Sequence, residues 1–210
     1  MQAINDLWNA GDELAWRDAL NCYWSYIKPE NLELEKGMNV LDSEEIERLS
    51  SREWYDFLKD KYFRWKYTAS NRLTTTTNQL KKYETANSLG ELFSIKEKLF
   101  AFNVTDIDQG LRIAKSIKGL GSAGASGLLA LLFPKWFGTV DQFVVKALCE
   151  IESLPERQQV CAMDPEGLSE KDAVLLIQIM RRKASELNAL FGTGEWTPRK
   201  IDMILWASRQ

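Results

Sequence analysis

Residues 113–148 read IAKSIKGLGSAGASGLLALLFPKWFGTVDQFVVKAL, and the predicted architecture follows from this segment. Gly119 and Gly121 frame a turn that needs backbone freedom, so a helix running from about residue 106 should end near residue 117. A second helix should begin at Ser122, where small residues allow close helix packing and the apolar residues after them supply core. The segment therefore predicts a helix, a tight hairpin and a second helix.

The hairpin also has the chemistry of an anion-binding site. Two glycines at a helix N-terminus leave backbone amides free to point at a phosphate, and the helix dipole favours negative charge there. Lys115 and Lys118 lie beside the turn. Further along, Asp141 should stand at the start of another helix, 20 residues after Gly121. A basic hairpin and a carboxylate at a helix start are thus the two candidate functional features of the segment.

This arrangement resembles the signature of the helix-hairpin-helix DNA glycosylase superfamily, and the similarity covers roughly residues 107–148. That signature is an apolar residue, Gly-x-Gly, a helix of small residues and then Val-Asp opening the next helix. The resemblance implies that the hairpin binds a DNA phosphate and that Asp141 is the catalytic carboxylate facing a flipped nucleotide. The DNA-backbone contacts that it implies are Gly119, Gly121, Lys118 and Ser122.

The segment departs from the family pattern in ways that bear on the chemistry. Members that cleave the strand through a Schiff base carry a lysine two positions after the second hairpin glycine, where this chain has Ala123. The usual Thr-His after the aspartate is replaced by Gln142 and Phe143. The resemblance therefore implies a monofunctional enzyme without lyase activity, and the target base of the best-known members does not carry over.

Two further segments are similar to the family in a looser way. Residues 61–83 resemble the helix pair that approaches the lesion from the opposite side, and residues 196–206 resemble the closing helices of some members. For the aromatic residues of the first segment, core packing is the alternative to a base pocket. Arg72 could instead be a plain phosphate contact or part of a surface ion pair. The candidates for a base pocket or a wedge are Trp65, Tyr67, Asn71 and Arg72.

The composition excludes many classes of enzyme. The chain of 210 residues contains no histidine, which excludes Ser/His/Asp triads, Cys/His dyads and metal sites that need imidazole. The three cysteines are one short of the thiolates of a conventional iron–sulfur cluster. We expect them to be core residues or inert thiols in a reducing cytoplasm. Neither a metal nor another cofactor is therefore predicted.

Hydrolysis of an N-glycosidic bond is compatible with this composition. The reaction builds positive charge on the deoxyribose, and a carboxylate aimed at the sugar stabilises that charge and can orient the attacking water. The base must first leave the stack and enter an aromatic or apolar pocket. Asp141 is the residue we assign to this role, although it could simply cap its helix. The two glycines could likewise be a structural turn between helices.

Charge is unevenly distributed along the chain, although its net value is only −3. Residues 30–57 carry nine acids against three bases. Residues 59–82 carry seven bases against one acid, with aromatic residues interleaved. The basic run fits either a nucleic-acid contact or a solvated helix face, and the acidic total leaves open a module that binds other proteins.

Signals for helix ends recur along the chain. Capping-box spacing occurs at Asp42, Thr105 and Ser169, each of which stands three residues before a carboxylate. Thr197 before a proline marks another start, and Gly192 marks a stop. The sequence contains no Asn-Gly or Asp-Gly hairpin turn, so we predict an all-α protein.

The resemblance and the helix pattern together predict a two-lobed helix-hairpin-helix DNA glycosylase-like fold. One lobe should comprise residues 1–58 and 150–210, and the other residues 59–149 with the hairpin. The longest strongly apolar run, residues 128–133, is too short to span a bilayer, and the N-terminal residues do not resemble a targeting signal. We therefore expect a cytoplasmic protein, nucleoid-associated if bacterial, with no membrane partner.

The leading functional prediction is a monofunctional DNA glycosylase, acting in repair or against modified foreign DNA. It would be a monomer whose partner is DNA. One alternative is a non-enzymatic helix-hairpin-helix DNA-binding protein that lacks the chemistry. A third is a helical protein-interaction module, which the low isoelectric point of about 5.3 favours.

Overall fold

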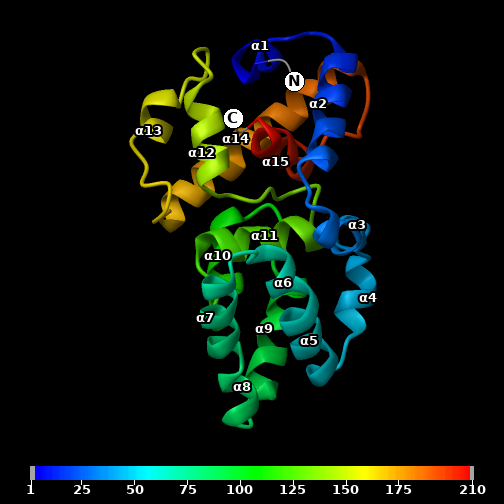
Figure 1. Ribbon diagram of the computed structural model, residues 1–210, viewed down its shortest axis with the longest axis vertical. Helices are drawn as coiled ribbons and strands as arrows, with labels where there is room; N and C mark the ends of the chain where they lie inside the picture. Colours follow the sequence, from blue (N-terminus) through cyan, green and yellow to red (C-terminus); the bar gives the residue numbers. More distant parts are fainter. Residues whose placement is uncertain (1–2, 209–210) are drawn as a thin grey trace. The chain divides into compact units, whose positions relative to one another are not determined.

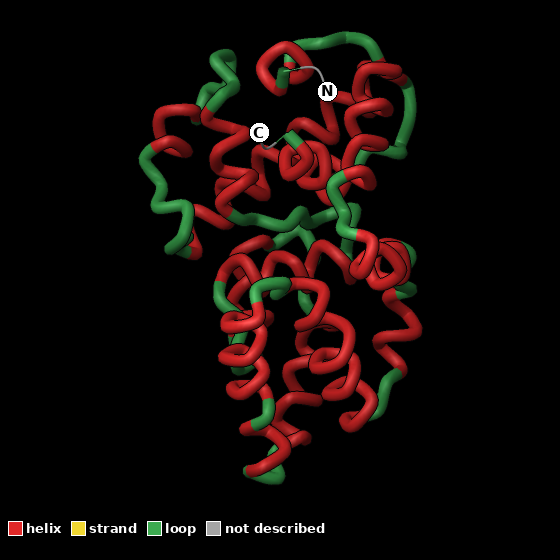
Figure 2. The backbone as a smooth tube through the Cα atoms, viewed as in Figure 1, coloured by secondary structure: helices red, strands yellow, loops and turns green. Residues whose placement is uncertain are grey.

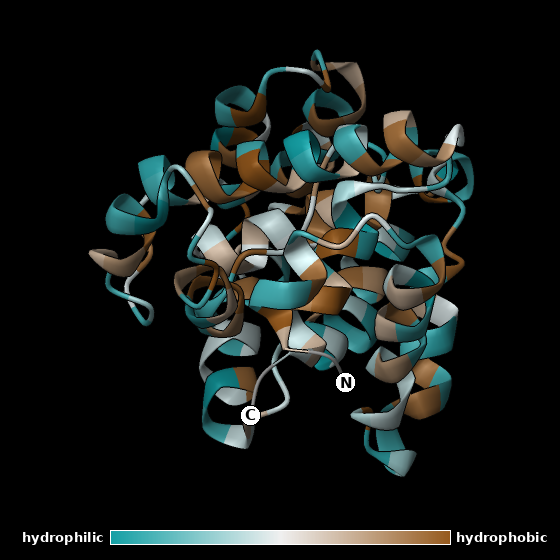
Figure 3. Cartoon of the chain, turned by 90° about the horizontal axis from the view of Figure 1, so that it is seen from above, coloured by the Kyte–Doolittle hydropathy of each residue, from teal (hydrophilic) through white to brown (hydrophobic). Residues whose placement is uncertain are grey.

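The computed structural model describes residues 3–208, and every regular element in that range is a helix (Figure 2). The predicted all-α class is thereby confirmed. Along most of the helices hydrophobic and hydrophilic residues alternate around the axis, as Figure 3 shows by colour. Such amphipathic helices bury one face and leave the other in solvent. None of the described helices is long and apolar enough to cross a membrane.

The chain divides into two compact units (Figure 1). The terminal unit comprises Met1–Lys28 and Pro134–Gln210, and the central unit comprises Pro29–Phe133. The helices of the terminal unit are α1 (Ile4–Trp8), α2 (Glu13–Ser25), α12 (Gln142–Cys149), α13 (Arg157–Cys161), α14 (Glu170–Phe191) and α15 (Pro198–Ala207).

The central unit carries the predicted hairpin. It contains a short 3-10 turn and a π-helical turn, η1 (Pro29–Asn31) and η2 (Leu58–Tyr62). Its α-helices are α3 (Leu32–Asn39), α4 (Ser43–Arg48), α5 (Ser51–Phe57), α6 (Phe63–Lys66), α7 (Ser70–Leu80), α8 (Lys82–Thr85), α9 (Leu89–Ala101), α10 (Ile107–Lys115) and α11 (Ser122–Leu132).

The core of the terminal unit is built around α15, which packs against α2, α12 and α14. Trp16 is fully buried between the rings of Trp8 and Trp196, with centroid separations of 6.1 and 6.0 Å. In the central unit α10 packs on α11 and α5 packs on α9. Burial of such large rings removes much apolar surface from water and stabilises the unit.

The boundaries between the units differ from the predicted ones. Residues 29–58 join the hairpin because α5 packs on α9 and because the buried Lys96 ammonium donates to the Glu47 carbonyl at 2.7 Å and to that of Leu49. Residues 134–149 join the C-terminal helices because α12 packs against α13 and α15. Both shifts result from packing between distant segments, which the local pattern does not contain.

Most of the predicted helix starts and ends are confirmed, although Asp42 caps α4 by accepting the Glu44 amide at 2.9 Å and not through the predicted capping box. Ser169 forms a capping box with Asp172, and Gly192 ends α14 with φ +65°. Thr197 caps α15 through its hydroxyl. The start predicted at Thr105 is wrong by one residue, because the side chain of the next residue, Asp106, accepts the Gln109 amide at 2.9 Å.

The prediction that the cysteines are inert thiols is wrong for two of them. Cys149 at the end of α12 and Cys161 at the end of α13 form a disulfide, with Cα atoms 5.3 Å apart. Packing of α13 against α12 brings the two residues within bonding range. Cys22 on α2 is free. Disulfides are uncommon in reducing compartments, so this bond does not support the expected cytoplasmic location. That location stays a prediction.

Candidate functional site

The hairpin of the central unit has two glycines with different structural roles. Gly119 has φ +99°, and a Cβ there would lie 2.7 Å from the Thr76 carbonyl oxygen and 3.2 Å from the Phe63 ring. Its backbone conformation and its surroundings both require glycine. Gly121 has an ordinary φ of −93° and is exposed, and a Cβ there would meet nothing within 4 Å. The fold therefore does not need glycine at position 121.

The N-terminus of α11 presents open backbone amides. Among residues 3–208, no acceptor forms a hydrogen bond with the amides of Gly121, Ser122 and Ala123. The first amides of any helix lack a partner within that helix, and the dipole gives this end partial positive charge. Ser122 is only 8% exposed, so its contact with a ligand would be made by its amide.

Two tyrosines donate hydrogen bonds to backbone carbonyls of the hairpin and of the first turn of α11. The Tyr62 hydroxyl donates to the Gly124 carbonyl in the first turn of α11, and the Tyr67 hydroxyl donates to the Gly119 carbonyl at 3.3 Å. A Cβ on Gly124 would lie 2.4 Å from the Tyr67 hydroxyl, so the small residue at position 124 permits this approach. The small residues of α11 therefore allow tyrosine side chains, as well as neighbouring helices, to pack closely against this helix.

A third tyrosine supports the first half of the turn. The Tyr83 hydroxyl donates to the Ser116 carbonyl and accepts the Lys118 amide, both at 3.2 Å. The Lys118 ammonium lies 4.1 Å from the centre of the Tyr83 ring and 3.8 Å from the Glu91 carboxylate. Its side chain is 39% exposed, so it can still reach a bound anion.

Both candidate pocket aromatics make structural contacts. Tyr67 packs edge-on against Phe63, and burial raises its pKa to about 12, although the nearby positive charge of Arg72 acts in the opposite direction. The Trp65 indole donates to the Glu35 carboxylate at 2.6 Å. These contacts are those of core packing, the alternative interpretation of the two aromatics, and their role in a base pocket stays a prediction.

The two wedge candidates, Asn71 and Arg72, lie exposed in the first turn of α7. The Asn71 side-chain oxygen accepts the Arg72 amide at 2.8 Å. Within the described part of the chain, the Arg72 guanidinium has neither a carboxylate nor a hydrogen-bond acceptor. Among residues 3–208 Arg72 forms no surface ion pair, so its candidate roles are a phosphate contact or a wedge.

Asp141 belongs to the terminal unit and caps α12. Its Oδ1 accepts the amides of Phe143 at 2.9 Å and Val144 at 3.1 Å. Its Oδ2 has no hydrogen-bond donor among residues 3–208, and the residue is half-buried. The hydrogen bonds to Oδ1 thus orient the carboxylate, while Oδ2 accepts no hydrogen bond from the described residues. Capping is shown, and it leaves the second oxygen available for a substrate.

Side chains of α15 fix the segment that leads to Asp141. The Thr139 amide donates to Asp202 Oδ2 at 2.6 Å, and the Arg199 guanidinium donates to Asp202 Oδ1 at 2.7 Å. Arg199 and Asp202 are 6% and 3% exposed, so this is a buried ion pair with little competition from water. Gly138 lies in the same segment and is closely packed. A Cβ there would lie 2.7 Å from both Met180 Sδ and the Pro198 carbonyl oxygen.

Arg181 of α14 fixes the same segment at its start. Its guanidinium donates to the Trp136 carbonyl and lies 5.0 Å from the centre of the Phe137 ring, and burial lowers its pKa to about 10. Arg181, Arg199 and Asp202 were not predicted from the sequence. The signal for the last two was their separation of three residues on one helix, the spacing of an ion pair on one face.

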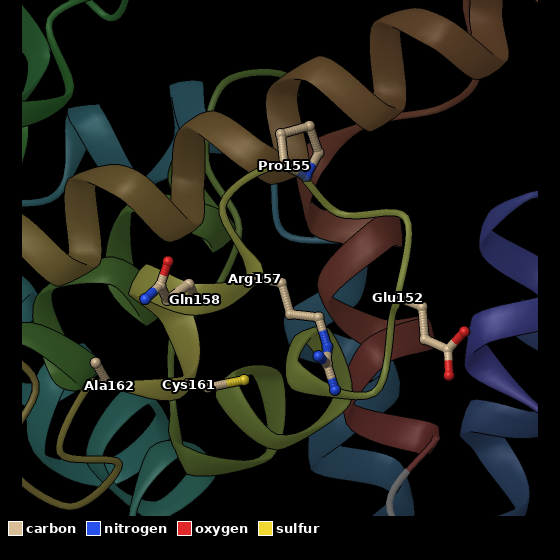
Figure 4. A pocket seen from close by; sticks show the side chains of 6 residues that line it. All are labelled: Glu152, Pro155, Arg157, Gln158, Cys161 and Ala162. Atoms are coloured by element: carbon tan, nitrogen blue, oxygen red, sulfur yellow. The ribbon is translucent and has the colours of Figure 1, made fainter.

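A hollow in the terminal unit lies outside the predicted site. It has a volume of about 640 Å³ and is shown in Figure 4. Arg157 and Cys161 lie on its wall, and Arg157 Nε donates to the Cys149 carbonyl at 2.7 Å. Among the described residues, no three acidic or cysteine side chains are grouped so that they could hold a metal ion.

The structure brings together part of the predicted site. The hairpin, Lys118, Ser122 and Tyr67 meet in the central unit, whereas Asp141 lies in the terminal unit. No known protein family, curated protein or solved structure matches the chain. The resemblance to helix-hairpin-helix glycosylases therefore stays a prediction from the sequence motif.

Proposed function

We propose that the protein is a monofunctional DNA glycosylase that hydrolyses the N-glycosidic bond of a flipped, damaged or modified base. The observation that carries the proposal is the hairpin, whose exposed Gly121 and open amides form a surface that a phosphate can approach closely. The fold does not require glycine at position 121, because a Cβ there would meet nothing within 4 Å. A requirement for close approach by a ligand accounts for the glycine.

Asp141 supplies the chemistry in this proposal. Its capping bonds fix the carboxylate, so little reorganisation is needed when positive charge develops on the sugar. The free Oδ2 would stabilise that charge or orient the attacking water. Thr139 and Asp202 act as positioning residues, because their bond fixes the backbone two residues before the carboxylate.

A non-enzymatic DNA-binding protein is the second candidate function. The two amide bonds to Asp141 favour it, because capping alone explains an aspartate at this position. The two candidates share the hairpin and differ only in what Asp141 does.

The deciding experiment is a panel of oligonucleotides that carry uracil, alkylated, oxidised or hypermodified bases. Each is incubated with the protein and then treated with hot alkali, which cleaves the strand at abasic sites. Strand cleavage with one class of base supports a glycosylase, and borohydride should trap no covalent adduct because Ala123 cannot form a Schiff base. Binding to DNA without any excision across the panel would leave the non-enzymatic candidate.

Asp141→Asn is the matched variant for this assay. Asparagine keeps the size and the capping oxygen but removes the charge. We expect unchanged folding, unchanged or slightly tighter binding to undamaged DNA, and single-turnover excision reduced by at least about a hundredfold. Full excision by the folded variant would remove Asp141 from the mechanism. The control, Asp141→Ala, should also lose the cap, at a cost of about 1 kcal/mol in stability.

A further inference from the structure

A second polar feature lies in the central unit, in a groove between the η2–α6 segment and α7. The groove has a volume of about 290 Å³. Basic side chains line it from both walls, Lys59 and Arg64 from one and Lys81 from the end of the other. Asp60 is the one acidic residue in its lining.

The groove carries positive charge that the protein does not neutralise. Asp60 lies 3.6 Å from the Lys59 ammonium, so these two charges offset each other. No described carboxylate pairs with Arg64 or Lys81. Arg64 and Arg72 are the two described arginines whose guanidinium has neither an ion pair nor a hydrogen bond, since every other one binds a carboxylate or a backbone carbonyl. An unpaired guanidinium matches the geometry of phosphate oxygens.

Neutral hydrogen-bonding groups accompany these cations. The hydroxyls of Thr74 and Thr76 donate to carbonyls one turn earlier in α7. By contrast, neither the Thr77 hydroxyl nor the Asn78 amide, which both line the groove, has a hydrogen-bond partner among the described residues. Two donors are thus open beside two unpaired cations, which is the donor set that an oxyanion accepts.

We propose that this groove binds the phosphodiester backbone of DNA at a place distinct from the hairpin. Leu73 and Lys81, which both line the groove, lie about 12 Å apart along the axis of α7 at the rise of an α-helix. This length spans several phosphates of one strand and exceeds the size of a single inorganic ion. The proposal rests on the DNA binding proposed above and is independent of Asp141 and of excision.

The test compares two double variants of the full chain. Arg64→Gln/Lys81→Gln removes both unpaired charges of the groove. Arg48→Gln/Lys98→Gln removes two exposed charges elsewhere in the central unit and is the matched control. Affinity for a fluorescent, undamaged DNA duplex is measured by anisotropy at several salt concentrations, after thermal unfolding has shown that both variants are folded.

We expect the affinity of the groove variant for DNA to fall about tenfold or more. The slope of its log affinity against log salt should become less negative by about 2. The control should bind as the wild type does. Thr77→Val, which keeps the shape of the side chain, should lose about two- to fivefold. A groove variant that matches the control in affinity and slope overturns the inference, as does binding of inorganic phosphate without binding of duplex.

The outcomes separate this inference from the proposed enzyme activity. If the groove variant loses affinity while no base in the panel is excised, DNA binding by the groove is supported and the glycosylase activity is contradicted. If excision depends on Asp141 while the groove variant binds DNA as the wild type does, the glycosylase activity is supported and DNA binding by the groove is contradicted.

Discussion

Gly119 and Gly121 stand two residues apart in the hairpin, and only the first is needed by the backbone. Gly121→Val should lower the melting temperature by no more than about 4 °C, because its Cβ points into open space and the main cost is a less favourable N-cap residue. DNA affinity should fall about tenfold, since a side chain there blocks the approach of a phosphate. Anisotropy titration and thermal unfolding measure the two effects. Unchanged affinity in the folded variant would mean that the turn is purely structural.

Gly119→Ala is the contrasting variant. Its Cβ would meet the Thr76 carbonyl oxygen at 2.7 Å, and alanine is strained at φ +99°. We expect a loss of about 1–3 kcal/mol in the free energy of unfolding, measured with urea. A stability equal to that of the wild type would contradict the geometry assigned to the turn.

Tyr67 makes the hairpin sensitive to alkali. Burial raises its pKa to about 12, whereas in the unfolded chain tyrosine ionises near about 10. Its contribution to stability is therefore complete below about pH 10 and is lost as the pH rises through about 12. The free energy of unfolding should fall across this window, and Tyr67→Phe should reduce the fall. An equal fall in the variant would show that Tyr67 is not the titrating group.

At the scale of the elements, the disulfide joins the ends of α12 and α13 across 12 residues. Closing a loop of this length restricts the unfolded chain and stabilises the native state by about 3 kcal/mol in the chain-entropy model. Cys149→Ser should lose about that much in urea unfolding under oxidising conditions. Reductant should destabilise the wild type and leave the variant unchanged. Cys22→Ser, the control, should keep the full effect of reductant, because Cys22 is free.

Helix ends could be predicted where their cause lies within a few residues. Gly192 and Thr197 act through their own backbone conformation and hydroxyl, and both were found. The disulfide was missed because only the packing of α13 on α12 reveals that two cysteines are neighbours. In the same way, the hairpin glycines could be found from the sequence, whereas the hydrogen bonds of Tyr62 and Tyr67 to the hairpin carbonyls could not.

At the scale of the whole molecule, the sequence predicted two helical lobes but not their limits. The C-terminal limit of the hairpin unit is Phe133, and not residue 149, because α12 is apolar on the side that packs against α15. An apolar face shows that a helix is buried without showing which partner covers it. As a result, the segment predicted to form one functional motif, residues 113–148, is continuous in sequence but is divided between two units in the structure.

The net charge of −3 hides the property on which the proposed function depends. Much of the acidity is already paired within the fold, as at Glu84 with Arg52 and Glu156 with Arg182, whereas Arg64 and Arg72 have no partner among residues 3–208. DNA binding should therefore occur despite the acidic total and weaken as salt rises, because each neutralised phosphate releases a counterion.

The salt dependence decides between a DNA-binding protein and a protein-interaction module. With about four phosphates contacted, log affinity should fall against log salt with a slope of about −3.6 for duplex DNA. Heparin, a polyanion without bases, should compete for the same cations. A module that binds other proteins would instead show no DNA affinity at low salt. That result, obtained with a folded protein, would contradict the roles assigned to both the hairpin and the groove, since each requires phosphate binding.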